Sequence, residues 1–165
     1  MNVKSSNELV DWTQVDLAEQ LFSDILDPHT GEPVLIRATN VLVMPAYRHA
    51  AHRVFQASEI TYQGSGAATI TRAGNPLADY RVFDSRLAYR RIIASGVSAS
   101  TAAMWWFMGD FRRAFAYMEN WPITVTQSGT GSEADFSQDV VMRFKASERG
   151  AAAVINPRYV VKNTG

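Results

Sequence analysis

The last third of the chain alternates short apolar runs with turn residues. The runs cover residues 105–111, 114–118, 123–125, 140–144 and 152–161, and residues such as Gly, Pro, Asn and Asp separate them. Apolar runs of this length bounded by turn residues are typical of β-strands. No motif with the spacing of a catalytic site lies among them. The pattern therefore favours a protein that works through its shape and surface, and it predicts no enzymatic activity.

These strands are expected to form the core of the protein. Residues 123–125 and 140–144 are predicted to share one sheet. Trp121 is predicted to be largely buried, because large aromatic side chains dominate protein cores. Pro122 is expected at the start of a strand, because proline lacks the N–H that a strand interior uses.

Length and composition limit the possible classes of protein. The first residues are polar, and residues 1–9 are expected to form a separate N-terminal segment. A chain of 165 residues is long enough for one domain, which is predicted to be an α+β domain over residues 10–165. The absence of cysteine excludes disulfides and thiolate metal sites. A net charge of zero without a Lys/Arg block argues against a dedicated nucleic-acid binder, so any DNA contact is expected to be weak and non-specific. No apolar run is long enough for a membrane span, and no signal core opens the chain.

Helical spacing of apolar residues recurs in the first third of the chain. It predicts a helix over residues 14–26, with Thr13 as N-cap and Asp16 three residues later, ending before Pro28. A buried strand is predicted over 40–44, and a second helix over 45–57 that starts at Pro45.

The middle of the chain gives weaker signals. Residues 63–75 contain Gly64, Gly66 and Gly74 and are predicted to be a mobile loop that proteases cut first. Residues 80–83 alternate like a strand, and 87–94 are compatible with a strand or a helix. A short helical turn is predicted near residues 133–137.

Two histidines and two glycine-rich segments are candidates for a metal site and for phosphate-binding loops, respectively. His49 and His52 share one face of the second predicted helix, but no neighbouring third ligand completes a metal site. Gly64-Ser65-Gly66 and the segment 129–132 lack the lysine and the following helix of a phosphate-binding loop. Both segments are better explained as turns.

The remaining polar and aromatic candidates also have simple explanations. Ser, His and Asp occur without a nucleophile elbow, and the neighbouring carboxylates have the pattern of solvated surface. Salt bridges or intersubunit contacts explain the arginine pairs better than phosphate binding does. Trp105, Trp106 and Trp121 are expected to anchor a core or an interface. No catalytic, cofactor-binding or metal-binding residue is predicted. The carboxylates are Glu133, Asp135, Asp139 and Glu148, and the pairs are Arg90-Arg91 and Arg112-Arg113.

Several weak motifs, in one order, resemble the major capsid proteins of tailed phages. Gly109-Asp110-Phe111 precedes an aromatic strand and the apolar segment 123–125. Arg143-Phe144 follows, then the charged turn Glu148-Arg149, and the segment 154–161 resembles the closing strand of that family. Upstream, residues 31–33 and the segment 40–45 resemble the family's axial domain. The resemblance covers residues 10–162.

The resemblance implies the Hong Kong 97-type capsid fold, an α+β wedge with an axial and a peripheral domain. It implies a structural subunit of a phage or prophage-derived icosahedral capsid, assembled in the bacterial cytoplasm. The implied partners are other copies of the chain, the family's missing N-terminal half or other capsid proteins, with no membrane and no cofactor. Some members carry a Lys–Asn crosslink, but no such pair is assigned here.

The chain departs from this family pattern at its beginning. The N-terminal arm, the extended loop and the spine helix of the family are not recognisable in it. A fragment, a separately encoded half and a truncated relative with another role all stay open as explanations. We therefore expect a monomer or a weak small ring and no closed shell from this chain alone. Two alternatives also stay open: an encapsulin-like compartment shell, and a small-molecule enzyme of unknown type.

Overall fold

The computed structural model describes residues 2–62, 70–127 and 143–165, which divide into two units. The first unit contains Met1–Ala114 and Asn156–Gly165, and the second contains Phe115–Ile155. The strand-rich last third therefore does not form the core of the whole chain. It is divided between the end of the first unit and a separate second unit.

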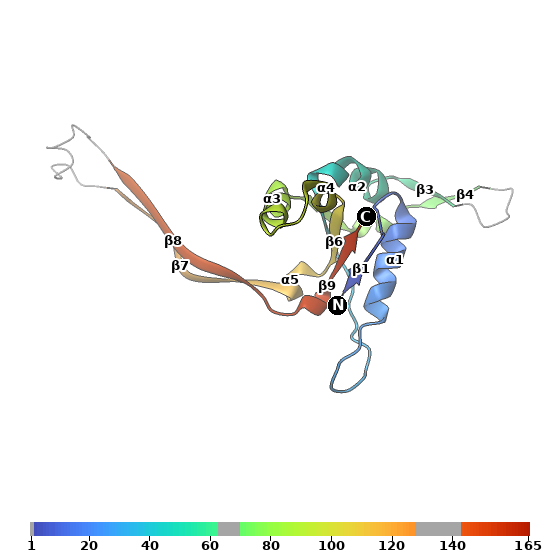
Figure 1. Cartoon of the computed structure of the whole chain (residues 1–165), viewed down its shortest axis with the longest axis horizontal. Helices are drawn as coiled ribbons and strands as arrows, with labels where there is room; N and C mark the ends of the chain where they lie inside the picture. The colour runs from blue at the N-terminus through green and yellow to red at the C-terminus, as the bar shows by residue number, and fades with distance from the viewer. Residues whose placement is uncertain (1, 63–69, 128–142) are drawn as a thin grey trace. The chain divides into compact units, whose positions relative to one another are not determined.

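A five-stranded mixed sheet forms the centre of the first unit (Figure 1). Its strands lie in the order β1-β9-β6-β2-β5. Strand β6 is antiparallel to both of its neighbours, while the outer pairs β1/β9 and β2/β5 are parallel. The strands are β1 (Val3–Lys4), β9 (Val160–Thr164), β6 (Trp105–Gly109), β2 (Asn40–Val43) and β5 (Arg81–Asp84). The predicted strands at 40–44 and 80–83 are thus confirmed within a residue or two.

The register of the sheet aligns its buried side chains in rows. Val41 pairs with Met108, which pairs with Val161, and all three are fully buried. Because residues two apart share a face of a strand, the next row on the same face contains Val43, Trp106 and Asn163. The aligned rows explain why these three strands form the centre of the core.

A buried polar cluster joins the two ends of the chain at this row. The Asn7 side-chain amide donates to the Asn163 side-chain oxygen at 2.9 Å and to the Gln14 carbonyl at 3.0 Å. The Trp106 indole N–H donates to the Asn7 carbonyl at 2.8 Å. Buried polar groups are costly unless they are paired, so these bonds hold residues 3–9 firmly against β9 and β6.

Helix α1 (Trp12–Ser23) packs on the sheet through Val15, Ala18 and Phe22. Its spacing confirms the predicted amphipathic helix, but the predicted start is wrong by two residues. The N-cap is Asp11, whose carboxylate accepts the Thr13 N–H at 2.8 Å, while the Gln14 side chain accepts the Asp11 N–H. This reciprocal pair is a capping box, and a cap at Asp11 places Thr13 inside the first turn.

The other helices are short. A 3₁₀ turn, η1 (Pro45–Tyr47), leads into α2 (Arg48–Phe55), which confirms the predicted second helix. The ambiguous residues 87–94 belong to α3 (Arg86–Ala94), because the Ser85 hydroxyl caps the helix by accepting the Ala88 N–H. The remaining short elements of the first unit are η2 (Pro76–Asp79), α4 (Ala99–Ala103), α5 (Phe111–Ala114) and η3 (Pro157–Tyr159).

A small antiparallel hairpin corrects the predicted loop at 63–75. Strand β3 (Glu59–Tyr62) pairs with β4 (Thr71–Gly74), so residues 71–74 are extended and hydrogen-bonded. The small residues of this segment signalled a loop, but the backbone pairing does not depend on side-chain size. Residues 63–69 lie outside the described residues.

The second unit is a long two-stranded hairpin. Strand β7 (Phe115–Gln127) is antiparallel to β8 (Phe144–Val154) and is interrupted by two register shifts, from Glu119 to Trp121 and from Trp121 to Thr124. The prediction that 123–125 and 140–144 share a sheet is confirmed at Phe144, which pairs with Gln127. Residues 140–142 and the predicted turn at 133–137 lie outside the described residues.

Two predictions about this hairpin are wrong. Trp121 is 56% exposed, because it sits in a two-stranded hairpin and not in the core. Pro122 lies in the middle of β7 and not at its start. It falls at a register shift between Trp121 and Thr124, where a bulge leaves a residue without a partner and tolerates the missing N–H.

The hydrophobic core lies in the first unit and consists of side chains from the sheet, α1, α2 and the segments beside them. Mixed helices and sheets of this kind confirm the α+β class. The buried members are Leu9, Val15, Ala18, Phe22, Ala38, Val41, Val43, Tyr47, Ala51, Val54, Phe55, Leu77, Trp106, Met108 and Val161.

Candidate assembly surface

The hairpin β7/β8 is the most apolar exposed surface among the described residues. Half of the exposed large apolar side chains lie in this unit, although it is much the smaller of the two. Exposed apolar side chains gathered on one element are a feature of sites of association. The exposed members are Phe115, Tyr117, Met118, Trp121, Ile123, Val125, Phe144, Val154 and Ile155.

Side-chain contacts across the strands stabilise the hairpin. The Tyr117 hydroxyl donates to a Glu148 carboxylate oxygen at 2.7 Å, and the Thr124 and Ser147 hydroxyls are 3.0 Å apart. The hydrogen bond to Glu148 raises the pKa of Tyr117. The Tyr117 ring crosses directly over Gly150, where a Cβ atom would meet the phenol. A larger residue at position 150 would displace the Tyr117 ring from this place.

The motif Gly109-Asp110-Phe111 builds the junction where the chain leaves the sheet. The Asp110 N–H donates to the Tyr159 carbonyl at 3.0 Å, and the Asp110 carboxylate accepts the Arg112 N–H at 3.1 Å. The carboxylate also lies 3.5 Å from Arg113 Nε. The Asn156 N–H donates to the Ala114 carbonyl at 3.3 Å. These bonds hold the two chain segments that leave the first unit side by side.

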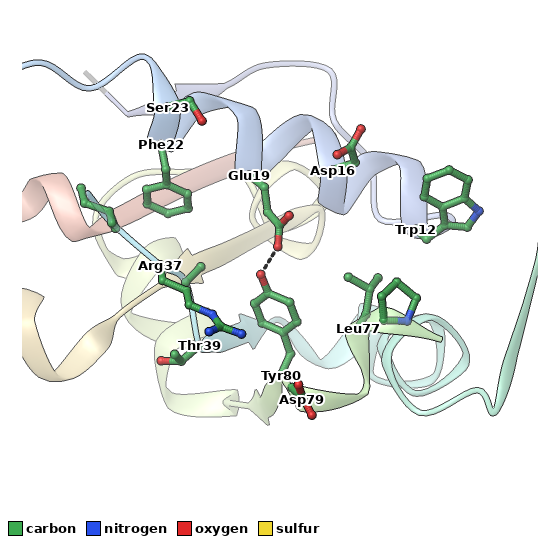
Figure 2. A pocket seen from close by; sticks show the side chains of 13 residues that line it. Trp12, Asp16, Glu19, Phe22, Ser23, Arg37, Thr39, Leu77, Asp79 and Tyr80 are labelled. Atoms are coloured by element: carbon green, nitrogen blue, oxygen red, sulfur yellow. Dashed lines mark hydrogen bonds between the residues drawn. The ribbon is translucent and has the colours of Figure 1, made fainter. Parts of the chain in front are cut away.

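A cleft of about 660 Å³ lies in the first unit, between α1 and the segments 36–39 and 76–80. Figure 2 shows the Tyr80 hydroxyl reaching across it to Glu19, to which it donates a hydrogen bond. Burial and then this carboxylate raise the pKa of Tyr80, which keeps the phenol protonated. A shift away from neutrality is the opposite of what a general base needs. Three carboxylates line the cleft, from Asp16, Glu19 and Asp79.

The predicted metal candidates are not brought into a common site. His49 and His52 are both exposed on α2, and the His52 ring contacts the Gln56 side-chain oxygen at 2.6 Å. Among the described residues, no three His, Asp or Glu side chains gather where they could hold a metal ion. The segments 64–66 and 129–132 lie outside the described part of the chain.

The arginine pairs have different environments. Arg90 and Arg91 are exposed on α3. Arg113 pairs with Asp110 and lies 5.7 Å from the Tyr159 ring centre, which confirms a structural role for this residue. Of the clustered carboxylates, Glu148 bonds to Tyr117, and Glu133, Asp135 and Asp139 are outside the described residues.

The three tryptophans differ in how far they are buried. Trp106 is fully buried, as expected for a core anchor. Trp105 is half-buried beneath the Lys162 ammonium, which lies 3.1 Å from the ring centre. Trp121 is exposed on the hairpin, so the prediction of a core anchor is wrong for this residue, and its role as an interface anchor stays a prediction. In the described ranges, no helix combines the length and apolarity needed to cross a bilayer.

An ordered hairpin rich in exposed apolar side chains is typical of proteins that act by association with other proteins. The chain belongs to the family of phage capsid proteins, whose family model matches residues 3–163. No curated protein matches it. The family match confirms the resemblance seen in the sequence and indicates a structural role in the virion capsid.

Proposed function

We propose that this chain is a self-associating subunit of an icosahedral phage capsid with the Hong Kong 97-type fold. The observation that carries the proposal is the apolar surface of the β7/β8 hairpin. An ordered strand pair that exposes this much apolar surface to water is stabilised when a second protein covers it. In a capsid, the second protein is another copy of the subunit.

The composition of the hairpin supports this proposal. Interfaces are enriched in aromatic residues and Met and depleted in charge at their centres. Tyr117, Met118 and Trp121 fit the enrichment in aromatic residues and Met, and the charged residues Glu119, Lys145 and Arg149 lie on the same hairpin. The contacts between Tyr117 and Glu148 and between Thr124 and Ser147 already order the hairpin in the free chain, so association requires little further ordering. Less ordering lowers the entropic cost of binding.

Charged substitutions on the hairpin test the proposal. Met118 and Ile123 are 71% and 65% exposed, so Met118→Glu with Ile123→Glu changes the surface without opening a core cavity. We expect this variant to melt like the wild type and to associate at least about tenfold more weakly, because carboxylates resist burial in an apolar interface. Light scattering over a concentration series measures the association.

Leu35→Glu is the matched control, because Leu35 is exposed but lies in the first unit. It should associate like the wild type. Equal association by the hairpin variant and the wild type would show that the hairpin is not the interface.

A further inference from the structure

The net charge of zero conceals a separation of charge along the chain. Residues 5–36 contain seven acidic residues and no Lys or Arg. Residues 37–113 contain ten Lys or Arg and four acidic residues. Each segment therefore has a strong net charge, and the two segments have opposite signs.

The acidic segment lines one side of the cleft beside α1. Asp16 and Glu19 come from this segment, Asp79 adds a third carboxylate from the opposite wall, and Arg37 is the one cationic residue in the lining. Trp12 and Leu77 give the cleft apolar walls, and Figure 2 shows them on either side of it. The cleft therefore suits an occupant that carries positive charge together with an apolar side chain.

Helix α3 has these properties. Its exposed residues are Arg86, Leu87, Arg90, Arg91 and Ala94. At 100° per residue they fall on one side of the helix. This stripe contains three arginines, no acidic residue, and Leu87, which is 69% exposed. No residue of α3 is fully buried, so this face lacks a covering element in the described part of its own chain.

The two charged surfaces do not pair within the chain. Arg113 pairs with Asp110, and within the described ranges neither the cleft carboxylates nor the α3 arginines form an ion pair. Helix α1 and helix α3 lie on opposite sides of the first unit (Figure 1). An acidic surface and a basic surface on opposite sides of one unit can meet only between different copies.

We propose that the α3 stripe of one copy docks into the acidic cleft of the next copy. The contact is heterologous, since two different surfaces meet, and its repetition closes into a ring when the rotation allows. Arginine guanidinium groups match carboxylates in geometry, while Leu87 contacts the apolar walls. This inference rests on the proposed self-association and names a contact within it that is separate from the hairpin.

Charge exchange tests the contact. The acidic-side variant is Asp16→Lys with Asp79→Lys, which leaves Glu19 bonded to Tyr80. The basic-side variant is Arg86→Glu with Arg90→Glu, two exposed positions one turn apart. Each variant alone should associate at least about tenfold more weakly than the wild type, because like charges then face each other. Their equimolar mixture should associate again, and so should one chain that carries all four substitutions.

A matched variant separates the specific contact from net charge. Arg48→Glu with Arg53→Glu makes the same charge change on exposed positions of α2. It should associate like the wild type, and combining it with Asp16→Lys and Asp79→Lys in one chain should not restore association, because the lysines of the cleft would still face the α3 arginines. Rescue by the α2 variant, or unchanged association of either single-sided variant, would overturn the docking of α3 into the cleft. Hairpin variants that still weaken association would then leave the proposed function standing, whereas a strictly monomeric wild-type chain contradicts both proposals.

Discussion

At the scale of single residues, Gly109 makes the closest backbone approach in the first unit. A Cβ atom at this position would meet the Tyr159 carbonyl and lie 2.9 Å from Val160 Cα. Both neighbours are backbone atoms of the segment that pairs with β6, so neither can move without disturbing the sheet. The close backbone of the neighbouring segment thus explains why the first residue of the Gly-Asp-Phe motif is glycine, and the sequence alone did not reveal this reason.

Gly109→Ala should lower the free energy of unfolding by about 1–3 kcal/mol, the usual cost of overpacking. Gly74→Ala is the control, because a Cβ there meets nothing within 4 Å. Its effect should stay within about 0.5 kcal/mol. Urea unfolding followed by circular dichroism measures both, and equal stabilities for the two variants would contradict the steric reason.

The tryptophans offer a second contrast at this scale. Trp106 is fully buried and donates to Asn7, so Trp106→Ala should destabilise the fold by about 3–5 kcal/mol. Trp121 is 56% exposed, so Trp121→Ala should cost about 1 kcal/mol or less, as is usual away from a core. Thermal melting of the two variants compares them. A larger loss for Trp121 would mean that the hairpin contributes to the core.

Stability should also fall in strong alkali. Burial, followed by repulsion from Glu8, raises the pKa of Tyr47 from 10.0 to about 12. The folded state therefore holds this proton more tightly, and the resulting stability is complete below pH 10 and lost as the pH rises towards 12. Tyr47→Phe should reduce the loss between pH 10 and 12 in urea unfolding. An identical pH profile in the variant would show that Tyr47 titrates normally.

At the scale of elements, the sequence predicted what depends on local pattern. Helices α1 and α2 bury residues at helical spacing, and β2 is a short apolar run before a proline, so their periodicity was sufficient. Helix α3 stayed ambiguous because its half-buried residues give a weak pattern. Its best signal was the cap at Ser85, a serine directly before the periodic residues.

Elements that depend on distant contacts could not be predicted in this way. Residues 115–127 form one strand across Pro122, because the bulge is set by pairing with β8. An apolar strand has the same sequence pattern whether it is covered by its own chain or by another chain. The exposure of Trp121 was therefore not predictable, whereas the charge separation behind the acidic cleft was readable from residue counts alone.

The hairpin should be dispensable for folding of the first unit. The Asn156 N–H bonds to the Ala114 carbonyl, so the two ends that the hairpin connects are already adjacent, and the core cluster contains no hairpin residue. Replacing residues 115–155 by a short Gly/Ser linker should preserve a cooperative melt and its midpoint within a few degrees. Loss of the cooperative transition would show that the two units fold as one.

At the scale of the whole molecule, the structure combines one packed unit with one exposed apolar element. The core accounts for the stability of the first unit, and the hairpin and the charged surfaces are the proposed sites of association. The family match to phage capsid proteins over residues 3–163 agrees with this division of roles. Both proposed contacts join different copies, so the protein should associate in solution and its mass should rise with concentration.

Multi-angle light scattering of the wild-type chain over a concentration series, up to about 1 mM, tests that claim most directly. We expect the mass to rise with concentration towards a small ring, and the rise to weaken in high salt, where the Debye length falls to about 3 Å at 1 M. A mass that stays at 18.3 kDa throughout the series would contradict a self-associating capsid subunit.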